Sequence, residues 1–327
     1  MIDIIATFVK QAIIQGIPLL YGSTGEIITE KSGNLNLGIP GIMYIGGIAS
    51  VIGAYFYESS CTELNPVLCV LIPLCCAFFG SMLMALIYSF LTITLRANQN
   101  VTGLALTTFG VGVGNFFGGS LSSLFGEGGS ISLIRTGSCF KATLPFADKL
   151  GLFGKTFLSF GFLAYLSILI ALVASWVLNR TRVGLNLRAV GESPATADAA
   201  GINVTRYKYV ATCLGGGIAG LGGLYFIMDY IGGAWTNGGF GDRGWLAIAL
   251  VIFALWRPTS SILGSILFGG LYIVYLYIPG LSRSSQEIFK MLPYVVTIVV
   301  LVIMSIRRRR ENQPPASLGL SYFREER

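Results

Sequence analysis

Nine apolar runs constrain this chain more strongly than any other feature of its sequence. A helix needs about 20 consecutive apolar residues to cross the hydrocarbon core of a bilayer, and only 11% of the residues are charged. A soluble surface requires more charge than that, so we predict an all-α, polytopic membrane protein of about eight to ten transmembrane helices. The runs lie near residues 4–21, 38–56, 67–94, 101–119, 156–178, 209–231, 244–256, 259–279 and 291–306.

Two of these runs differ from ordinary spans. The run 67–94 is long enough to tilt or to bend at Pro73. The run 244–256 is short, and we expect its helix to extend back through Gly241 or forward into the turn Trp256-Arg257-Pro258. The polar stretch 21–38 forms either an ordinary turn or a discontinuous helix that crosses the membrane. In the second case its irregular backbone must be buried or line a cavity.

Positive charge gathers in two of the connecting segments. Residues 179–208 carry five cations, and residues 307–310 are four consecutive arginines. Short loops rich in Lys and Arg stay on the cytoplasmic side, so we predict that both segments are cytoplasmic. Simple alternation then places the N-terminus outside, unless the stretch 21–38 crosses. We expect a single transmembrane domain over residues 1–310 and a disordered, proline-containing cytoplasmic tail over 311–327.

The composition excludes several kinds of chemistry. The chain has no histidine, which rules out His-dependent triads and His-ligated zinc or haem. Its six cysteines lack metal-binding spacing, although a disulfide from Cys61 to Cys69 or Cys139 stays open. The stretch 151–156 resembles the end of a phosphate-binding loop, but Lys149 stands where that motif needs glycine. We therefore expect no metal, no cofactor and no enzymatic activity, ATP hydrolysis included.

Glycines four residues apart recur in two of the runs. Small residues at this spacing let membrane helices approach closely, which explains Gly216 and Gly220 better than a dinucleotide-binding motif does, because they open an apolar run. Another run repeats the spacing at Gly110, Gly114 and Gly118. The polar residues of that second run, Thr107 and Asn115, serve either interhelical hydrogen bonding or substrate contact.

The segment 179–208 also contains the signals of a short helix. Ser193 suits the N-cap, Pro194 suits the first helical position, and Gly201 suits the left-handed position after the last turn. A helix of two turns is marginal in water on its own, so we expect it to dock against another surface. The alternative is a solvated loop with an incidental helical turn.

The run Leu187-Arg188-Ala189-Val190-Gly191-Glu192-Ser193-Pro194, followed by small residues up to Gly201, resembles the cytoplasmic coupling loop of ATP-binding-cassette importer permeases. It is most similar to the nucleoside and simple-sugar branch, which is related to ribose and branched-chain amino acid permeases. The resemblance implies that the short helix sits in a groove of a separate ATPase subunit. The coupling residues it implies are Arg188, Ala189, Gly191, Glu192, Pro194, Ala197, Ala199 and Gly201.

Two further stretches resemble the same branch. Gly25-Glu26-Ile27 with residues 30–39, EKSGNLNLGI, is similar to the N-terminal signature of nucleoside-type permeases, except that Pro40 stands where those relatives usually carry Glu. Residues 241–253 with Trp256-Arg257-Pro258 resemble a second stretch of the branch. Discontinuous transporter helices frame the substrate path. The candidate path residues are Asn34, Asn36, Thr107 and Asn115.

The resemblance implies a permease subunit of an ATP-driven importer that translocates nucleosides or related simple sugars by alternating access. The implied partners are an ATP-binding subunit, a second homologous permease subunit, an extracytoplasmic substrate-binding protein and the lipid bilayer, without nucleic acid. The implied location is the bacterial cytoplasmic membrane, with multiple spans. Which cargo is carried, and whether the pore is a homodimer or a heterodimer, stay open.

Two other functions compete with this interpretation. A ribose-like or branched-chain amino acid permease would share the same loop and is the nearest alternative. An ion-coupled secondary transporter belongs to a different class and would want ionisable groups within its spans. The apolar runs hold almost none apart from Lys10 and Asp229, which disfavours that class.

Overall fold

The computed structural model describes residues 2–124, 131–141, 151–307 and 313–323. Within these ranges the chain is helical, and its strand-like pairing is limited to an isolated bridge between Ser132 and Ala234. Eight of the described helices are long and apolar enough to cross a membrane, and one shorter apolar helix accompanies them. The nine predicted runs each correspond to one of these helices, which confirms the all-α, polytopic fold.

The long helices form the body of the protein. They are α1 (Ile2–Glu30), α2 (Ile39–Ser60), α3 (Pro66–Ser89) with its π-helical continuation η1 (Phe90–Thr94), α4 (Gln99–Leu124), α7 (Phe162–Arg180), α10 (Val204–Leu224) with the π-helical η3 (Tyr225–Ile231), α12 (Pro258–Ile273) with the 3-10 turn η4 (Val274–Tyr277), and α14 (Leu292–Arg307). The shorter helices are α5 (Ile134–Phe140), α6 (Gly151–Phe157), α8 (Arg182–Glu192), α9 (Pro194–Ala199), α11 (Arg243–Phe253) and α13 (Arg283–Lys290).

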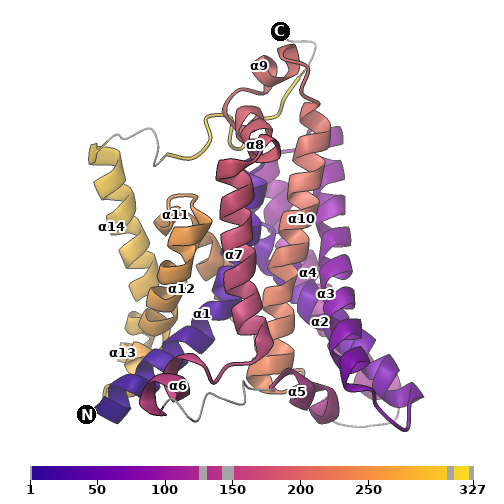
Figure 1. Ribbon diagram of the computed structural model, residues 1–327, viewed down its shortest axis with the longest axis vertical. Helices are drawn as coiled ribbons and strands as arrows, with labels where there is room; N and C mark the ends of the chain where they lie inside the picture. The colour runs from indigo at the N-terminus through magenta and orange to yellow at the C-terminus, as the bar shows by residue number, and fades with distance from the viewer. Residues whose placement is uncertain (1, 125–130, 142–150, 308–312, 324–327) are drawn as a thin grey trace.

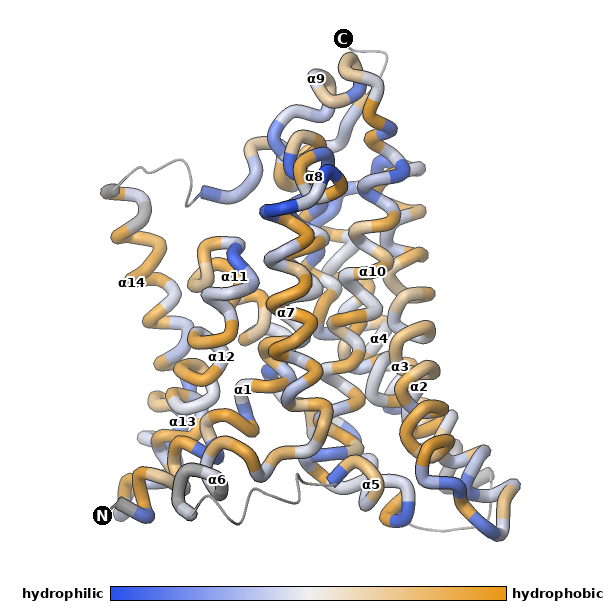
Figure 2. Tube along the Cα trace, in the orientation of Figure 1, coloured by the Kyte–Doolittle hydropathy of each residue, from blue (hydrophilic) through white to orange (hydrophobic). Residues whose placement is uncertain are grey.

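The helices run side by side between two distinct ends (Figure 1). One end holds α8, α9 and the last described residues, and the other holds the N-terminus, α5 and α6. Hydrophilic residues gather around α8, while the long helices are mostly hydrophobic (Figure 2). The N-terminus thus lies opposite the basic segment 179–208, as alternation predicts.

Helix α10 lies at the centre of the bundle and α14 at its edge. In the span Val204–Ile231, which contains α10, 83% of the most apolar 18 residues are buried. In the span Arg283–Ile303, which contains most of α14, the share is 11%. The glycines of α10 explain its close packing. A Cβ at Gly216 would overlap the side chain of Ala85, and one at Gly220 would overlap Ser81, both on α3. These glycines therefore lie at a close crossing of α10 and α3.

The stretch 21–38 contains the end of one helix and a turn. Helix α1 continues to Glu30, and α2 begins at Ile39, so residues 31–38 form the turn, in which Gly33 has a positive φ of 88°. Irregular backbone also occurs between η3 and α11, where Gly232, Gly233, Gly238 and Gly241 have positive φ. The turn is therefore the correct alternative for residues 31–38.

Helix α11 does not extend as we expected. It begins at Arg243, after a turn in which Gly241 has φ of 56°. It ends at Phe253, because Leu255 and Trp256 adopt left-handed conformations with φ of 57° and 53°. The expectation of a longer helix was wrong. The left-handed backbone of Leu255 and Trp256 ends α11 before α12 begins at Pro258.

The C-terminal strap, residues 313–323, is the described part of the tail. It lies against the α8 end of the bundle, where Tyr322 donates a hydrogen bond to Asp198 at 2.8 Å. The guanidinium of Arg96 lies 4.5 Å from the ring centre of Phe323. The other residues of the predicted tail 311–327 lie outside the described ranges. All six cysteines are free thiols.

Candidate functional site

Helix α9 is the capped helix that the sequence predicts. The Ser193 hydroxyl accepts a hydrogen bond from the Thr196 amide at 3.4 Å, and Pro194 stands in the first turn. Gly201 follows the helix with φ of 83°, in the left-handed region that favours glycine. Helix α8 has its own N-cap, since the Thr181 hydroxyl accepts from the Gly184 amide at 3.1 Å. Two capped helices in succession form a defined structure at this end of the bundle.

The two faces of α9 differ in exposure. Ala197, which we expected at the docking surface, is only 3% exposed and packs in one cluster with Val190 and Val204. Other residues of the segment are accessible to solvent. The exposed positions of the segment are Ala195, Thr196, Ala199, Ala200 and Gly201, with Glu192 just before them. The remaining predicted coupling residues, Arg188, Ala189 and Pro194, are half-buried.

Gly191 joins α8 to the turn after α1. A Cβ at this position would overlap the carbonyl oxygen of Lys31, so only glycine allows the contact. The strap reinforces it, because the amide and the hydroxyl of Ser317 donate to the Gly191 carbonyl at 3.0 and 2.5 Å. The Gly319 amide donates to the Gly33 carbonyl at 3.2 Å. The predicted coupling segment is thus in direct backbone contact with the turn that carries Asn34 and Asn36.

Charged residues surround this contact. Burial lowers the pKa of the Lys31 ammonium, and the nearby Arg188 and Arg257 act in the same direction, whereas the carboxylate of Glu192 opposes them. The Nε atom of Arg188 is buried without a hydrogen-bond partner among the described residues. The charge environment of Lys31 therefore depends on the position of α8, which carries both Arg188 and Glu192.

The turn 31–38 is held by hydrogen bonds from three helices. Asn34 donates to the Thr212 hydroxyl of α10 at 3.2 Å, and the Asn36 amide donates to Glu26 of α1 at 3.0 Å. The Leu35 amide donates to Gln99 of α4 at 2.7 Å. Both asparagines are almost fully buried, at 1% and 0% exposed. The turn is consequently tied to α1, α4 and α10.

The four predicted path residues separate into two groups. Thr107 joins the first group, since its hydroxyl donates to the Leu37 carbonyl of the turn at 2.9 Å. Asn115 lies further along α4, where it accepts from the Tyr44 hydroxyl at 2.5 Å. A Cβ at Gly114 would overlap the Tyr44 ring, and one at Gly110 would meet the backbone of Gly41. The structure therefore places Asn115 in an aromatic cluster rather than beside Asn34 and Asn36.

Several buried ionisable groups were not assigned a role from the sequence. Glu26 and Glu30 of α1 are 0% and 3% exposed, and the Trp256 indole donates to Glu30. Arg243 donates to Gln15 at 2.9 Å and lies 4.4 Å from the ring centre of Phe226. The two glutamates follow the run 4–21 and are four residues apart, which puts them on one face if the helix continues. That spacing is the sequence signal for this pair.

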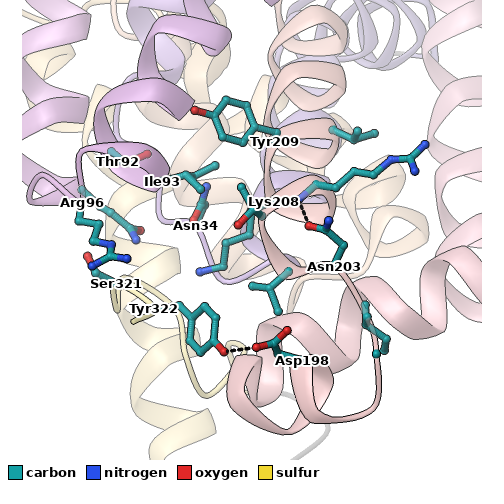
Figure 3. Close-up of a pocket in the computed structure, with 17 residues that line it drawn as sticks. Asn34, Thr92, Ile93, Arg96, Asp198, Asn203, Lys208, Tyr209, Ser321 and Tyr322 are labelled. Carbon is teal, nitrogen blue, oxygen red and sulfur yellow. Dashed lines mark hydrogen bonds between the residues drawn. The ribbon is translucent and has the colours of Figure 1, made fainter. Parts of the chain in front are cut away.

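A cavity of about 660 Å³ opens at this end of the bundle, between η1, α9, α10 and the strap (Figure 3). It adjoins both the coupling segment and the turn, because Asp198 and Asn34 line it. Its size lies within the usual range for small-molecule sites. Helix α9, the turn 31–38 and a ligand-sized cavity are thus neighbours.

Comparison with known proteins identifies related sequences over most of the chain. Residues 8–301 match the family model described as branched-chain amino acid transport system / permease component. The nucleoside ABC transporter permease protein NupC of Lactococcus lactis subsp. cremoris is 31% identical over 92% of this chain and 93% of its own length. The putative glucose ABC transporter permease protein TsgC13 of Haloferax volcanii is 32% identical over 94% of both chains. The guanosine ABC transporter permease protein NupQ of Bacillus subtilis is 27% identical over 92% of both. No solved structure matches the chain.

Proposed function

This chain belongs to the family of branched-chain amino acid transport system permease components, and from that membership we propose that it translocates nucleosides or related simple sugars as the membrane subunit of an ATP-driven importer. The cargo class follows from its relatives, which include two nucleoside-type permeases and one putative glucose permease. The importer works in the bacterial cytoplasmic membrane. Ribose-like or branched-chain amino acid cargo is the alternative within the family.

The energy in this proposal comes from a separate ATP-binding subunit. Helix α9 docks on that subunit through its exposed residues, among them Ala195, Thr196 and Ala199. Their side chains are small, so a groove on the partner can approach the helix backbone. The caps at Ser193 and Gly201 keep the helix formed while it transmits force. A second permease subunit completes the pore, and an extracytoplasmic binding protein delivers the cargo.

The observation that carries the proposal is the contact between Gly191 and the Lys31 backbone. It links the docking segment to the turn that holds Asn34 and Asn36. A shift of α9 on ATP binding moves α8, and α8 pushes the turn against α10 and α4 through the hydrogen bonds of Asn34 and Leu35. Alternating access follows when these helices exchange the side on which the path is open.

The buried glutamates favour one rival function. Glu26 and Glu30 lie one turn apart within α1, and ionisable groups inside a span are typical of ion-coupled transporters. Uptake by vesicles decides between the two. An ATP-driven importer keeps its uptake when ionophores dissipate the ion gradients and loses it when ATP is removed, whereas an ion-coupled carrier shows the reverse.

The docking proposal is tested with Ala199→Trp, which places a large ring on the exposed face of α9. We expect the ATP-binding subunit to dissociate from the membrane and uptake to fall, with permease abundance unchanged. Ser60→Trp, at an exposed position on the opposite end of the bundle, is the matched control and should retain the subunit. Normal retention and uptake with Ala199→Trp would exclude α9 as the docking element.

A further inference from the structure

The cavity beside α9 contains a buried cation without an anionic partner. Lys208 of α10 is 3% exposed, and its side chain extends into the cavity toward Arg96 (Figure 3). Among the described residues, no carboxylate forms an ion pair with Lys208, and its ammonium has no hydrogen bond. A buried charge is costly unless it is paired. A bound anion would supply the missing partner.

A second cation faces the same space from the opposite wall. Arg96 follows η1 in a left-handed conformation, with φ of 57°, and lines the cavity. Among the described residues, the guanidinium of Arg96 stacks over the ring of Phe323 in the strap. Its N–H donors can therefore bind a ligand in the cavity. Together, an ammonium and a guanidinium are the donor set that phosphate groups prefer.

Aromatic side chains complete the walls of the cavity, which Tyr209 and Tyr322 line. Asn34 also lines it, but its Oδ1 atom is closed off from the open space. A fitting ligand therefore combines an anionic group with a flat or apolar part.

We propose that this cavity binds a phosphate ester, with Lys208 and Arg96 holding the phosphate. Two sources provide this chemistry at the α8 end of the bundle: a soluble nucleoside monophosphate and the headgroup of an anionic glycerophospholipid. The nucleotide source rests on the proposed function, because a nucleoside phosphorylated after import is such an ester. The site itself rests only on the residues that line it.

Occupation of the cavity acts on the coupling segment. Asp198 of α9 and Tyr322 of the strap form one wall and are hydrogen-bonded to each other. A ligand held against that wall ties α9 to η1 and α10.

The test measures ligand binding to the full-length permease in nanodiscs of neutral lipid, without the ATP-binding subunit. The probes are inorganic phosphate, guanosine monophosphate and guanosine, and a parallel sample contains phosphatidylglycerol in the disc. Lys208→Met removes the buried charge and keeps the aliphatic chain, while Arg96→Met removes the second, exposed charge of the site. Arg206→Met, exposed at the edge of the same cavity, is the matched control.

We expect guanosine monophosphate to bind at least about tenfold more weakly to Lys208→Met than to the wild type, as for the loss of one charge-assisted hydrogen bond. Arg96→Met should weaken binding in the same direction, and Arg206→Met should not. If thermal stabilisation is seen only with phosphatidylglycerol and requires Lys208, the lipid headgroup is the source.

Two outcomes would overturn the site. Guanosine binding as tightly as its monophosphate, with no effect of Lys208→Met, would assign the cavity to the cargo route and leave the importer proposal intact. No binding of any probe would remove the site altogether. Because the ATP-binding subunit is absent from this experiment, its result is independent of the docking test on α9.

Discussion

Helices α8 and α11 are both 11 residues long, and both press a glycine against the segment 31–40. Gly191 of α8 meets the Lys31 backbone, and Gly244 of α11 meets Pro40. Their surroundings are opposite. Seven residues of α11 are buried, against four of α8, and α8 lies at the polar end of the bundle. The contact of α11 is therefore more deeply packed than that of α8.

Packing explains the difference. Leu246 and Leu250 of α11 lie in one apolar cluster with Leu19 and Phe268, between α1 and α12. Helix α8 contributes Val190 to one cluster and Leu187 to another, and it adds polar contacts such as the hydrogen bond from Asn186 to Tyr207 at 2.9 Å. Regions with few buried apolar contacts open most easily. We infer that α11 holds one side of the segment 31–40 fixed while α8 moves the other.

The largest effect should come from Gly244→Leu. The side chain would overlap Pro40 in a buried contact, and overpacking of this kind typically costs about 1–3 kcal/mol or more. We expect the yield of monodisperse protein in size-exclusion chromatography to fall steeply. Gly112→Leu is the control, because a Cβ at Gly112 meets nothing within 4 Å. Equal yields from the two variants would show that α11 is not a rigid support.

A smaller loss of stability should follow from Trp256→Phe at the end of α11. The change removes the indole donor to the buried Glu30 and leaves that carboxyl with an unpaired oxygen, at a cost of about 1–3 kcal/mol. The expected result is a lower thermal midpoint. Trp176→Phe provides the comparison, since Trp176 is 62% exposed and should tolerate the change. A shared midpoint would mean that the Trp256 contact does not stabilise the fold.

The smallest effect on stability should come from Ser317→Ala in the strap. It removes one hydrogen bond to Gly191, worth about 0.5–1.5 kcal/mol. Because α8 is weakly packed, we expect faster amide hydrogen exchange confined to residues 184–192. Ser321→Ala, in the same strap, should leave that exchange unchanged. Faster exchange throughout α11 as well would contradict the separation of the two helices.

The sequence predicts some of this arrangement and misses the rest for physical reasons. Apolar runs locate the spanning helices, and the caps at Ser193 and Gly201 locate α9, because both signals are local. The inward position of Ala197 is not predictable in this way, since a helix of six small residues lacks an apolar stripe. The contact of Gly191 with Lys31 joins positions 160 residues apart. The burial of Glu26 and Glu30 is not local either, because their partners are the Asn36 backbone amide and the Trp256 indole.

The strap shows the same limit. Its polar, proline-containing sequence predicts disorder, and nothing local distinguishes it from a free tail. Its backbone amides donate to the carbonyl groups of Gly33 and Gly191. Those acceptors lie next to the strap only in the tertiary structure, because they belong to the turn after α1 and to α8. Local patterns therefore identify the helices, while the joints between them depend on the tertiary structure.

The most direct test of the account is the coupling of ATP hydrolysis to uptake in Gly191→Ala. The added methyl group would displace α8 from the Lys31 carbonyl while leaving the exposed face of α9 unchanged. In reconstituted transporter, we predict that the ATP-binding subunit stays bound and hydrolyses ATP, but that cargo uptake per ATP falls at least about tenfold. Leu185→Ala, on the exposed side of α8, should keep the wild-type ratio. A wild-type ratio in Gly191→Ala would contradict the claim that α8 transmits motion to the turn.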